Sequence, residues 1–263
     1  DEIFPDLKGK RVAVIGGGNV AMDVCRSSVR LGADQVYCIY RRRIEDMTAL
    51  KEEIEGAIAE GVEILSLQAP SRIEGKDGKV SALWVQPQIV GAMRGGRPSP
   101  KNANCPEERI ECDIVIIAIG QAIGTTSFEA AGLPVKHNTF AATDTLAFKD
   151  LPGVFAGGDC TTGPATVIRA IAAGKVAAAN IDEYLGFYHE ITSDVDVPEP
   201  LHIDRRPCGR VNMKERKAYD RKDDMLPMEI NMTDEEAKQE SRRCLRCDFY
   251  GYGVLKGGRN RSW

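Results

Sequence analysis

The sequence has little of what marks membrane proteins or nucleic-acid-binding proteins. No apolar run in its 263 residues approaches the roughly 20 residues that span a bilayer, and no segment resembles a signal peptide. The formal net charge is only −4, which gives no reason to expect nucleic acid or an anionic membrane as a partner. With 43% apolar and 28% charged residues, the composition is that of an ordinary globular protein. We expect a cytoplasmic protein with no membrane span.

The cysteines also show almost none of the spacings that are typical of metal sites or disulfide frameworks. The chain has eight cysteines, and only Cys244 and Cys247 form a recognisable spacing. The others are scattered through expected strands and helices, as is typical of reduced thiols in a cytosolic protein. The chain also lacks an initial methionine, because it opens at Asp1. We therefore expect it to be part of a longer protein.

A glycine-rich turn near the start of the chain carries the clearest signal. An apolar run at 12–15 predicts a buried parallel strand, and the residues after the turn have the spacing of a helix. Gly16, Gly18 and Ala21 fill the three positions of the dinucleotide-binding pattern G-x-G-x-x-G/A. In that pattern the free N–H groups and the positive end of the helix dipole face a pyrophosphate. The predicted cofactor-binding residues in this turn are Gly16, Gly17, Gly18, Asn19 and Val20.

The end of the second expected strand, 35–40, indicates which nicotinamide coenzyme fits. NAD sites place an acidic residue there to bind the ribose 2′-hydroxyl, whereas NADP sites place arginine against the 2′-phosphate. This chain offers Arg41, Arg42 and Arg43 and no acid before Glu45. The planar fork of arginine donates two parallel hydrogen bonds to phosphate. We predict NADP(H) as the coenzyme, bound chiefly by Arg41 and Arg42; the alternative is a solvated basic run.

The rest of the first domain is predicted as a helix, several short strands and a long loop. The helix is expected over 47–60, the strands over 62–67, 71–74 and 80–86, and a polar Gly- and Pro-rich loop over 91–107. The stretch 109–119 predicts a buried central strand that ends at Gly120 and Gln121. Because nucleotides bind beyond the carboxyl ends of parallel strands, Gly120 and Gln121 are expected near the coenzyme. An ordinary strand-ending turn is the alternative at Gly120.

A second segment of strand, glycine turn and helix follows. Residues 154–159 predict a strand that closes on Gly157, Gly158 and Asp159. The alanine-rich stretch 165–185 predicts a long helix. Its many small residues permit close approach to a neighbouring sheet or ligand.

Three motifs in this order resemble those of a known family. They are VIGGGNVAMD, the strand end IAIGQ, and VFAGGDCTTGPATVIRAIAAGKVAAANI. Together they resemble the two-dinucleotide-domain flavoproteins, most closely the small-subunit (beta) type of glutamate synthase, over roughly residues 8–190. In that family a nicotinamide-binding domain is inserted within an FAD-binding domain, and the chain returns to the FAD domain through the Gly-Gly-Asp segment. The resemblance implies an NAD(P)H:FAD oxidoreductase of the superfamily that includes the pyridine nucleotide-disulfide oxidoreductases.

The resemblance also implies that the second segment binds FAD. Asp159 would accept a hydrogen bond from a ribityl hydroxyl or order water at the FAD phosphate; the alternative is a helix cap or surface turn residue. The start of the long helix offers unpaired N–H groups, which the family points at the flavin. The implied FAD-binding residues are Gly158, Asp159, Ala165, Thr166 and Val167. The family's first FAD fingerprint is not found in this sequence, so the remainder of that site is expected in the rest of the protein or in another subunit.

The tail is expected to be irregular until a short helix with paired cysteines. Residues 201–232 show little periodicity and are expected to lie extended over another domain or subunit. The string TDEEAKQESRRCLRCD resembles the opening of the iron–sulfur module of the same flavoprotein family. Cys244 and Cys247 are therefore candidate metal ligands, but no cysteine follows them, so the ligand set of a cluster is incomplete. A zinc site, a redox disulfide and an ordinary reduced pair are the alternatives.

These features predict an α/β fold in three parts. A Rossmann-like NADP(H)-binding domain with a parallel sheet and a small β-meander is expected at 1–121, the C-terminal part of an FAD-binding domain at 122–192, and an irregular tail at 193–263.

The family implies hydride transfer between NADP(H) and FAD, with electrons passed on to iron–sulfur clusters of a larger complex, glutamate synthase-like or electron-bifurcating. We name no catalytic residue. Hydride transfer requires that the protein position the nicotinamide against the flavin and supply a favourable electrostatic field, and it requires no side-chain acid or base. A non-catalytic nucleotide-binding scaffold and a thiol–disulfide reductase are the alternatives.

Overall fold

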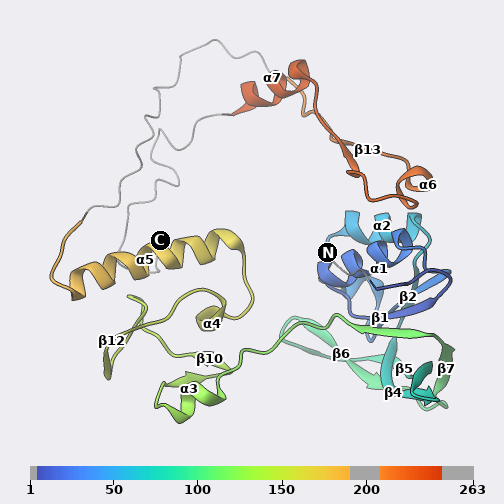
Figure 1. The fold of residues 1–263 in the computed structure, drawn as a ribbon, viewed down its shortest axis with the longest axis horizontal. Coiled ribbons are helices and arrows are strands. Elements are labelled where there is room, and N and C mark those ends of the chain that lie inside the picture. Colours follow the sequence, from blue (N-terminus) through green and yellow to red (C-terminus); the bar gives the residue numbers. More distant parts are fainter. Residues whose placement is uncertain (1–4, 190–207, 245–263) are drawn as a thin grey trace. The chain divides into compact units, whose positions relative to one another are not determined.

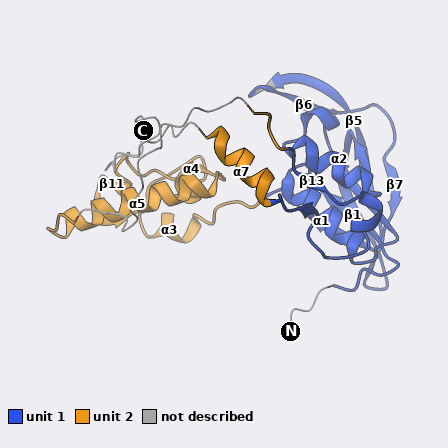
Figure 2. Cartoon of the chain, turned by 90° about the horizontal axis from the view of Figure 1, so that it is seen from above, with its two compact units in different colours: residues 1–120, 212–233 blue, residues 121–211, 234–263 orange. Residues whose placement is uncertain are grey.

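The structure is a computed structural model that describes residues 5–189 and 208–244. Figure 1 shows the ribbon, and Figure 2 colours the two compact units of the chain. The first unit comprises residues 1–120 and 212–233, and the second comprises 121–211 and 234–263. Each unit has its own buried core. The three domain ranges given above stay predictions.

A four-stranded parallel sheet forms the centre of the first unit. Its strands have the order β3-β2-β1-β8 and are β1 (Arg11–Ile15), β2 (Gln35–Tyr40), β3 (Glu63–Ser66) and β8 (Ile114–Ile117). Between β1 and β3 the chain forms α1 (Asn19–Arg30), the 3-10 turn η1 (Ile44–Asp46) and α2 (Lys51–Ala59) (Figure 1). This βαβαβ order confirms the predicted α/β fold class.

The side chains of β1 alternate between two cores, one on each face of the sheet. Val12 and Val14 belong to a core shared with residues of α1 and α2. Ala13 and Ile15 belong to the other core, which includes Leu83 of the antiparallel sheet. A parallel strand covered on both faces is apolar at every position, not at every second one. This explains the uninterrupted apolar run at the start of the chain.

The prediction of a loop over 91–107 was wrong. A second, antiparallel sheet consists of β4 (Gln68–Lys76), β5 (Lys79–Arg94), β6 (Arg97–Asn102) and β7 (Glu108–Glu111). The hairpin between β5 and β6 turns at Gly95 and Gly96, whose φ angles of 56° and 77° suit a two-residue turn. Pro98 and Pro100 conceal the strand in the sequence, but they are tolerated because β6 pairs along one side, with β5.

The prediction of one buried central strand over 109–119 was also wrong. This stretch forms two strands, since β7 pairs with β5 and β8 pairs with β1. The chain crosses between the sheets at Asp113, whose N–H donates to the Arg11 carbonyl and whose carboxylate accepts from the Arg11 N–H, both at 2.8 Å. Within the described part of the chain β8 lies at the edge of its sheet, and Ile117 is 64% exposed.

The second unit is built around a long helix and a small core. Its elements are α3 (Thr126–Ala130), β9 (Val135–Lys136), β10 (Thr139–Phe140), β11 (Ala147–Phe148), β12 (Leu151–Phe155), α4 (Asp159–Thr162), α5 (Val167–Tyr184) and α7 (Asp234–Arg243). Leu146, Ala173 and Val176 form the core. Neither α5 nor any other helix in the described ranges is long and apolar enough to cross a bilayer.

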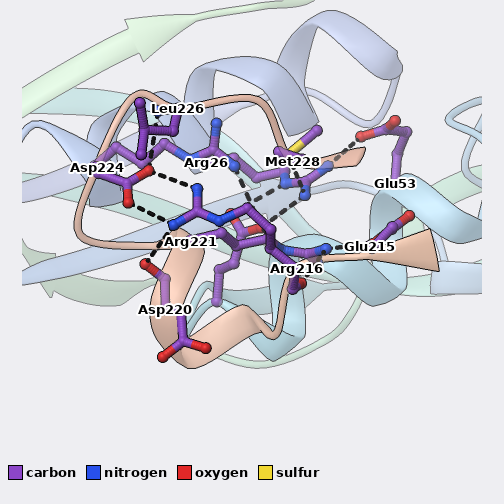
Figure 3. Close-up of polar contacts among 11 residues, drawn as sticks. Arg26, Glu53, Glu215, Arg216, Asp220, Arg221, Asp224, Leu226 and Met228 are labelled. Carbon is purple, nitrogen blue, oxygen red and sulfur yellow. Dashed lines mark hydrogen bonds and ion pairs between the residues drawn. The ribbon is translucent and has the colours of Figure 1, made fainter. Parts of the chain in front are cut away.

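Residues 212–233 return to the first unit and pack beside α2. They form β13 (Lys214–Glu215), α6 (Ala218–Arg221) and β14 (Glu229–Ile230). Figure 3 shows the polar contacts of this segment, in which Arg221 and Arg26 approach the same place from different parts of the chain. Their common partner is Glu60, whose Oε1 accepts from Arg221 Nε and from Arg26 Nη2, both at 2.6 Å.

Glu60 is the centre of a buried charge cluster. Its side chain is 0% exposed, and Arg26, Arg30 and Arg221 surround it. Burial alone would raise the pKa of Glu60, but the hydrogen bonds from Arg26 and the charges of the three arginines outweigh burial and lower that pKa below its ordinary value. Removing one side of such a cluster leaves buried charge without a partner, which is strongly destabilising.

Glu60→Gln should therefore lower the free energy of unfolding by about 3–5 kcal/mol, because three arginines lose their central carboxylate. Urea unfolding of the intact protein measures this. Glu55→Gln is the matched control, since Glu55 lies on α2, which ends directly before Glu60, and forms an exposed pair with Lys51 that is worth under about 1 kcal/mol. Equal losses for the two variants would contradict the assigned role of the cluster.

Candidate dinucleotide-binding site

A pocket of about 630 Å³ lies at the carboxyl ends of β1, β2 and β8 in the first unit. This is the edge of a parallel sheet at which nucleotides bind. The predicted residues that line the pocket are Gly16, Gly17, Gly18, Asn19, Val20, Arg41, Arg42 and Gly120. Gln121 is not among its lining residues. The structure thus brings together in one hollow all but one of the residues predicted for the nicotinamide coenzyme.

Gly16 lies where the end of β1 meets α1 and the residue that follows β8. A Cβ atom on Gly16 would overlap the carbonyl oxygen of Ala118 and would lie 3.0 Å from the Cβ of Ala21. Its N–H donates to the Ile39 carbonyl at 3.1 Å, which ties the turn to β2. The chain can make this turn only without a side chain at Gly16, and the small Ala21 leaves room from the helix side.

Gly17 and Gly18 have different surroundings. A Cβ on Gly17 would collide with the ring of Tyr40, whereas a Cβ on Gly18 would meet nothing nearer than Thr48 Oγ1 at 3.5 Å. Gly18 is the N-cap of α1 with extended backbone angles (φ −101°, ψ 177°), and its helix has no side-chain cap. The first N–H groups of a helix have no partner within the helix. The N-terminus of α1 therefore offers uncapped donors beside the open side of Gly18.

The turn is braced by the residues that precede α2. The N–H groups of Thr48 and Ala49 donate to the Gly17 carbonyl at 2.9 and 3.1 Å. The N–H of Leu50 donates to Asn19 Oδ1 at 2.8 Å. Because these N–H groups are bonded to the glycine turn, α2 begins at Lys51, and the prediction that it starts at residue 47 was wrong. The Asn19 side chain is thus engaged in bracing the turn.

The three arginines after β2 point to different partners. Arg41 is exposed, and among the described residues its guanidinium has no hydrogen-bond or ion-pair partner. Arg42 Nε donates to the Pro98 carbonyl at 3.0 Å. Arg43 does not line the pocket, because its fork is bonded to the Asp46 carboxylate at 2.9 and 3.0 Å. These bonds lower the pKa of Asp46 below its usual range. Arg41 and Arg42, and not Arg43, remain directed at the pocket.

Tyr40, Thr48 and Arg97 line the pocket as well, and the sequence interpretation missed them. Arg97 is the first residue of β6, and its Nη2 donates to Tyr40 Oη at 3.1 Å. A signal for it was present, since Gly95 and Gly96 are a common two-residue hairpin turn and Arg97 follows them directly. For Tyr40 and Thr48 the sequence holds no comparable signal.

The FAD-site prediction falls on a smaller cavity of about 290 Å³ in the second unit. Gly158, Asp159 and Ala165 line it, and Asp159 Oδ1 accepts from the Ala165 N–H at 3.2 Å. Thr166 is the N-cap of α5 and accepts from the Arg169 N–H at 3.4 Å. Val167 begins α5 and is 75% exposed. Three of the five predicted residues thus line this hollow, whereas Thr166 and Val167 are not among its lining residues. The arrangement fits part of an FAD site and not a complete one.

The paired tail cysteines are only half described. Cys244 directly follows α7 and is exposed, whereas Cys247 lies outside the described residues. Cys208 lies near the same helix, with its sulfur 3.7 Å from the Gln239 carbonyl. Among the described residues no three potential ligands come together as a metal site would require. The ligand role of Cys244 and Cys247 stays a prediction.

Comparison with known proteins decides the family. The family model for pyridine nucleotide-disulphide oxidoreductases matches residues 1–174, a span that contains both glycine segments. The chain belongs to this family. The predicted relationship is thereby confirmed.

Relatives with known names are similar over most of this chain. The NADP(+)-dependent formate dehydrogenase subunit beta of Moorella thermoacetica is 36% identical over 96% of the chain and 38% of its own length. The NADPH-Fe(3+) oxidoreductase subunit beta of Geobacter sulfurreducens is 30% identical over 92% of the chain and 42% of its own length. The glutamate synthase [NADPH] small chain of Escherichia coli is 35% identical over 70% of the chain and 41% of its own length. The chain thus spans less than half the length of each of these relatives.

Solved structures share the fold. Mycobacterium tuberculosis FprA in complex with NADPH matches 69% of this chain and 54% of its own with a TM-score of 0.54 and 19% identity. Thioredoxin reductase from T. acidophilum matches 68% and 53% with the same TM-score and 23% identity. At these identities the likeness is one of fold, and it agrees with the parallel sheet described above.

Two glycine substitutions should separate folding from binding. Gly16→Ala should destabilise the protein, because the new methyl group overlaps the Ala118 carbonyl. Gly18→Ala should leave the melting temperature within about 2 °C of wild type, since its backbone angles suit alanine and the space is open. It should nevertheless weaken dinucleotide binding at least about tenfold, because the methyl group occupies the side from which a diphosphate approaches.

Thermal melting and isothermal titration of the two variants with NADPH provide the measurement. A Gly18→Ala protein that binds as tightly as wild type would show that the diphosphate lies elsewhere.

Proposed function

We propose that this chain is the NADPH-binding portion of a flavin oxidoreductase that works within a larger electron-transfer complex. The observation that carries the proposal is the pocket of the first unit, in which an uncapped helix N-terminus and two arginines border one hollow. The helix start suits a pyrophosphate, and the arginines suit a further phosphate about one ribose away along the sheet edge.

Charge balance supports NADPH over NADH. Within the described ranges neither Arg41 nor Arg42 forms an ion pair with a carboxylate, although Arg43 beside them does. Two cations without an acidic partner at the coenzyme end of β2 attract an anion and offer nothing to accept a hydrogen bond from a ribose 2′-hydroxyl. The 2′-phosphate of NADPH is an anion and accepts hydrogen bonds from arginine, so it suits these two cations better than the 2′-hydroxyl of NADH does.

The second unit supplies part of the FAD site in this proposal. Bound FAD would supply the acceptor for a hydride from the nicotinamide. Asp159 would accept a hydrogen bond from a flavin-side hydroxyl or hold a water, and the N–H groups at the start of α5 would face negative charge. Asp159 also braces the turn before α5 through Ala165, so the same carboxylate fixes the helix start that faces the ligand.

An apolar surface on α5 supports the expected FAD-binding remainder as a partner. Val167, Ile168 and Ile171 are 75%, 78% and 56% exposed at the N-terminal end of this helix. Neighbouring exposed apolar side chains of this kind mark an interface. We propose that the FAD-binding remainder, in the same protein or another subunit, covers this surface and completes the site.

The names of the relatives support a role within a complex. They include beta subunits of a formate dehydrogenase and of an iron(III) oxidoreductase, and the small chain of glutamate synthase. We propose that electrons leave the flavin site for iron–sulfur clusters of such a complex in the cytoplasm. Cys244 and Cys247 would contribute to a cluster only with ligands from elsewhere, because the described residues do not assemble a set.

Replacing Arg41 and Arg42 together by alanine should weaken NADPH binding by about 100-fold and NADH binding by less than about threefold, because two charge-assisted bonds to the 2′-phosphate are lost. Isothermal titration of the intact protein with both coenzymes measures this difference. Equal losses for NADPH and NADH would show that the arginines do not bind the 2′-phosphate.

Asp159→Ala should lower the FAD content of the purified intact protein, measured from flavin absorbance per protein. Asp159→Asn is the matched control: it keeps an oxygen acceptor for the Ala165 N–H and should retain more FAD than the alanine variant. Unchanged flavin content in both variants would contradict the role proposed for Asp159.

A further inference from the structure

The hairpin of β5 and β6 brings a third arginine to the pocket from a part of the chain far from β2. We infer that Arg97 binds the 2′-phosphate of NADPH together with Arg41 and Arg42, so that the hairpin helps to set coenzyme specificity. The inference rests on the proposed function, because it presupposes that the pocket takes NADPH. All three arginines line the same hollow.

Arg97 is held in place by neutral partners. Its Nη2 donates to Tyr40 Oη at 3.1 Å and also contacts the Asp46 carbonyl, to which Tyr40 Oη donates at 2.8 Å. The Asp46 carboxylate is meanwhile bound by the fork of Arg43. Within the described residues no carboxylate forms an ion pair with Arg97, although its charge helps to lower the pKa of the nearby Asp46 carboxylate. The position of Arg97 is thus fixed while its remaining N–H groups stay available to an anion. Arginine carries five N–H donors, and these contacts engage only one nitrogen.

The same hairpin also orients Arg42. The carbonyl of Pro98, the residue after Arg97, accepts from Arg42 Nε at 3.0 Å. That bond leaves the two terminal nitrogens of Arg42 free to point elsewhere. Two consecutive residues of β6 therefore act on the end of β2, one by adding a cation and one by fixing a cation already there.

Tyr40 connects this arginine cluster to the glycine turn. Its ring lies against Gly17, where any side chain would collide with it, and its hydroxyl meets Arg97. Tyr40 is 8% exposed, so it is a fixed spacer between the seat of the pyrophosphate and Arg97. This arrangement suits NADPH, which carries a diphosphate and a separate 2′-phosphate. With NADH the 2′-phosphate is missing, and the three arginines would have no anion to bind.

The test uses the intact protein and two probes that differ only in one phosphate, 2′,5′-ADP and 5′-AMP. Arg97→Ala should weaken 2′,5′-ADP by about 10- to 100-fold in isothermal titration, the effect of losing one charge-assisted hydrogen-bond partner, and should change 5′-AMP by less than about twofold. Arg97→Lys keeps the charge but not the fork, and its affinity for 2′,5′-ADP should lie between those of the alanine variant and wild type. Lys101→Ala is the matched control, because it removes an exposed cation of the same strand, β6, that does not line the pocket, and it should change neither probe by more than about twofold.

Three results would overturn the inference: Arg97→Ala binds 2′,5′-ADP as tightly as wild type, it weakens both probes equally, or it matches Lys101→Ala. If the alanine variant melts early, Arg97→Lys decides, and wild-type affinity for 2′,5′-ADP in that variant overturns the inference. The proposed function is tested separately by the wild-type protein. If wild type binds 2′,5′-ADP no more tightly than 5′-AMP, the proposed function itself fails.

Discussion

The close approach of three backbone segments at Gly16 is the constraint on which the rest of the site depends. The Ala118 carbonyl and the Ala21 side chain leave no volume for a Cβ there. This contact sets where α1 begins relative to β1 and β8, and hence where its uncapped N–H groups lie. The Gly17 carbonyl is then held from the other side by Thr48 and Ala49. Backbone contacts thus fix the shape of the turn, which is where we propose that the diphosphate binds.

Sequence could predict the parts of this fold whose pattern is local. The apolar strand, the glycine spacing and the arginines after β2 all lie within 32 consecutive residues, 11–42, and each has a period or spacing that a single element produces. The hairpin of β5 and β6 was not predicted, because the two prolines of β6 and the glycines of the turn are typical of a loop. The division of 109–119 was missed because pairing with two different sheets is a tertiary property, set by partners distant in the chain. Arg97 belongs to the same class, since its place beside Tyr40 depends on strand pairing.

The return of residues 212–233 to the first unit shows how a charged, weakly periodic tail gains a defined place. Its anchor is one buried carboxylate, Glu60, which Arg221 shares with Arg26 of α1. Buried charge of this kind is permitted only where partners satisfy it. The segment thereby contacts α1, whose N-terminal end borders the pocket, and α2, which follows the pocket residue Thr48 in the chain. Helix α1 thus both borders the pocket and anchors the tail.

We propose that backbone donors at the start of α1 bind the diphosphate of NADP(H) while arginines bind its 2′-phosphate. A crystal structure of the intact protein with NADP⁺ tests it most directly. The account predicts diphosphate oxygens at about 2.7–3.2 Å from N–H groups among residues 17–20, with the 2′-phosphate against Arg41 and Arg42. A coenzyme bound away from the glycine turn, or one whose 2′-phosphate faces solvent with no arginine beside it, would contradict it.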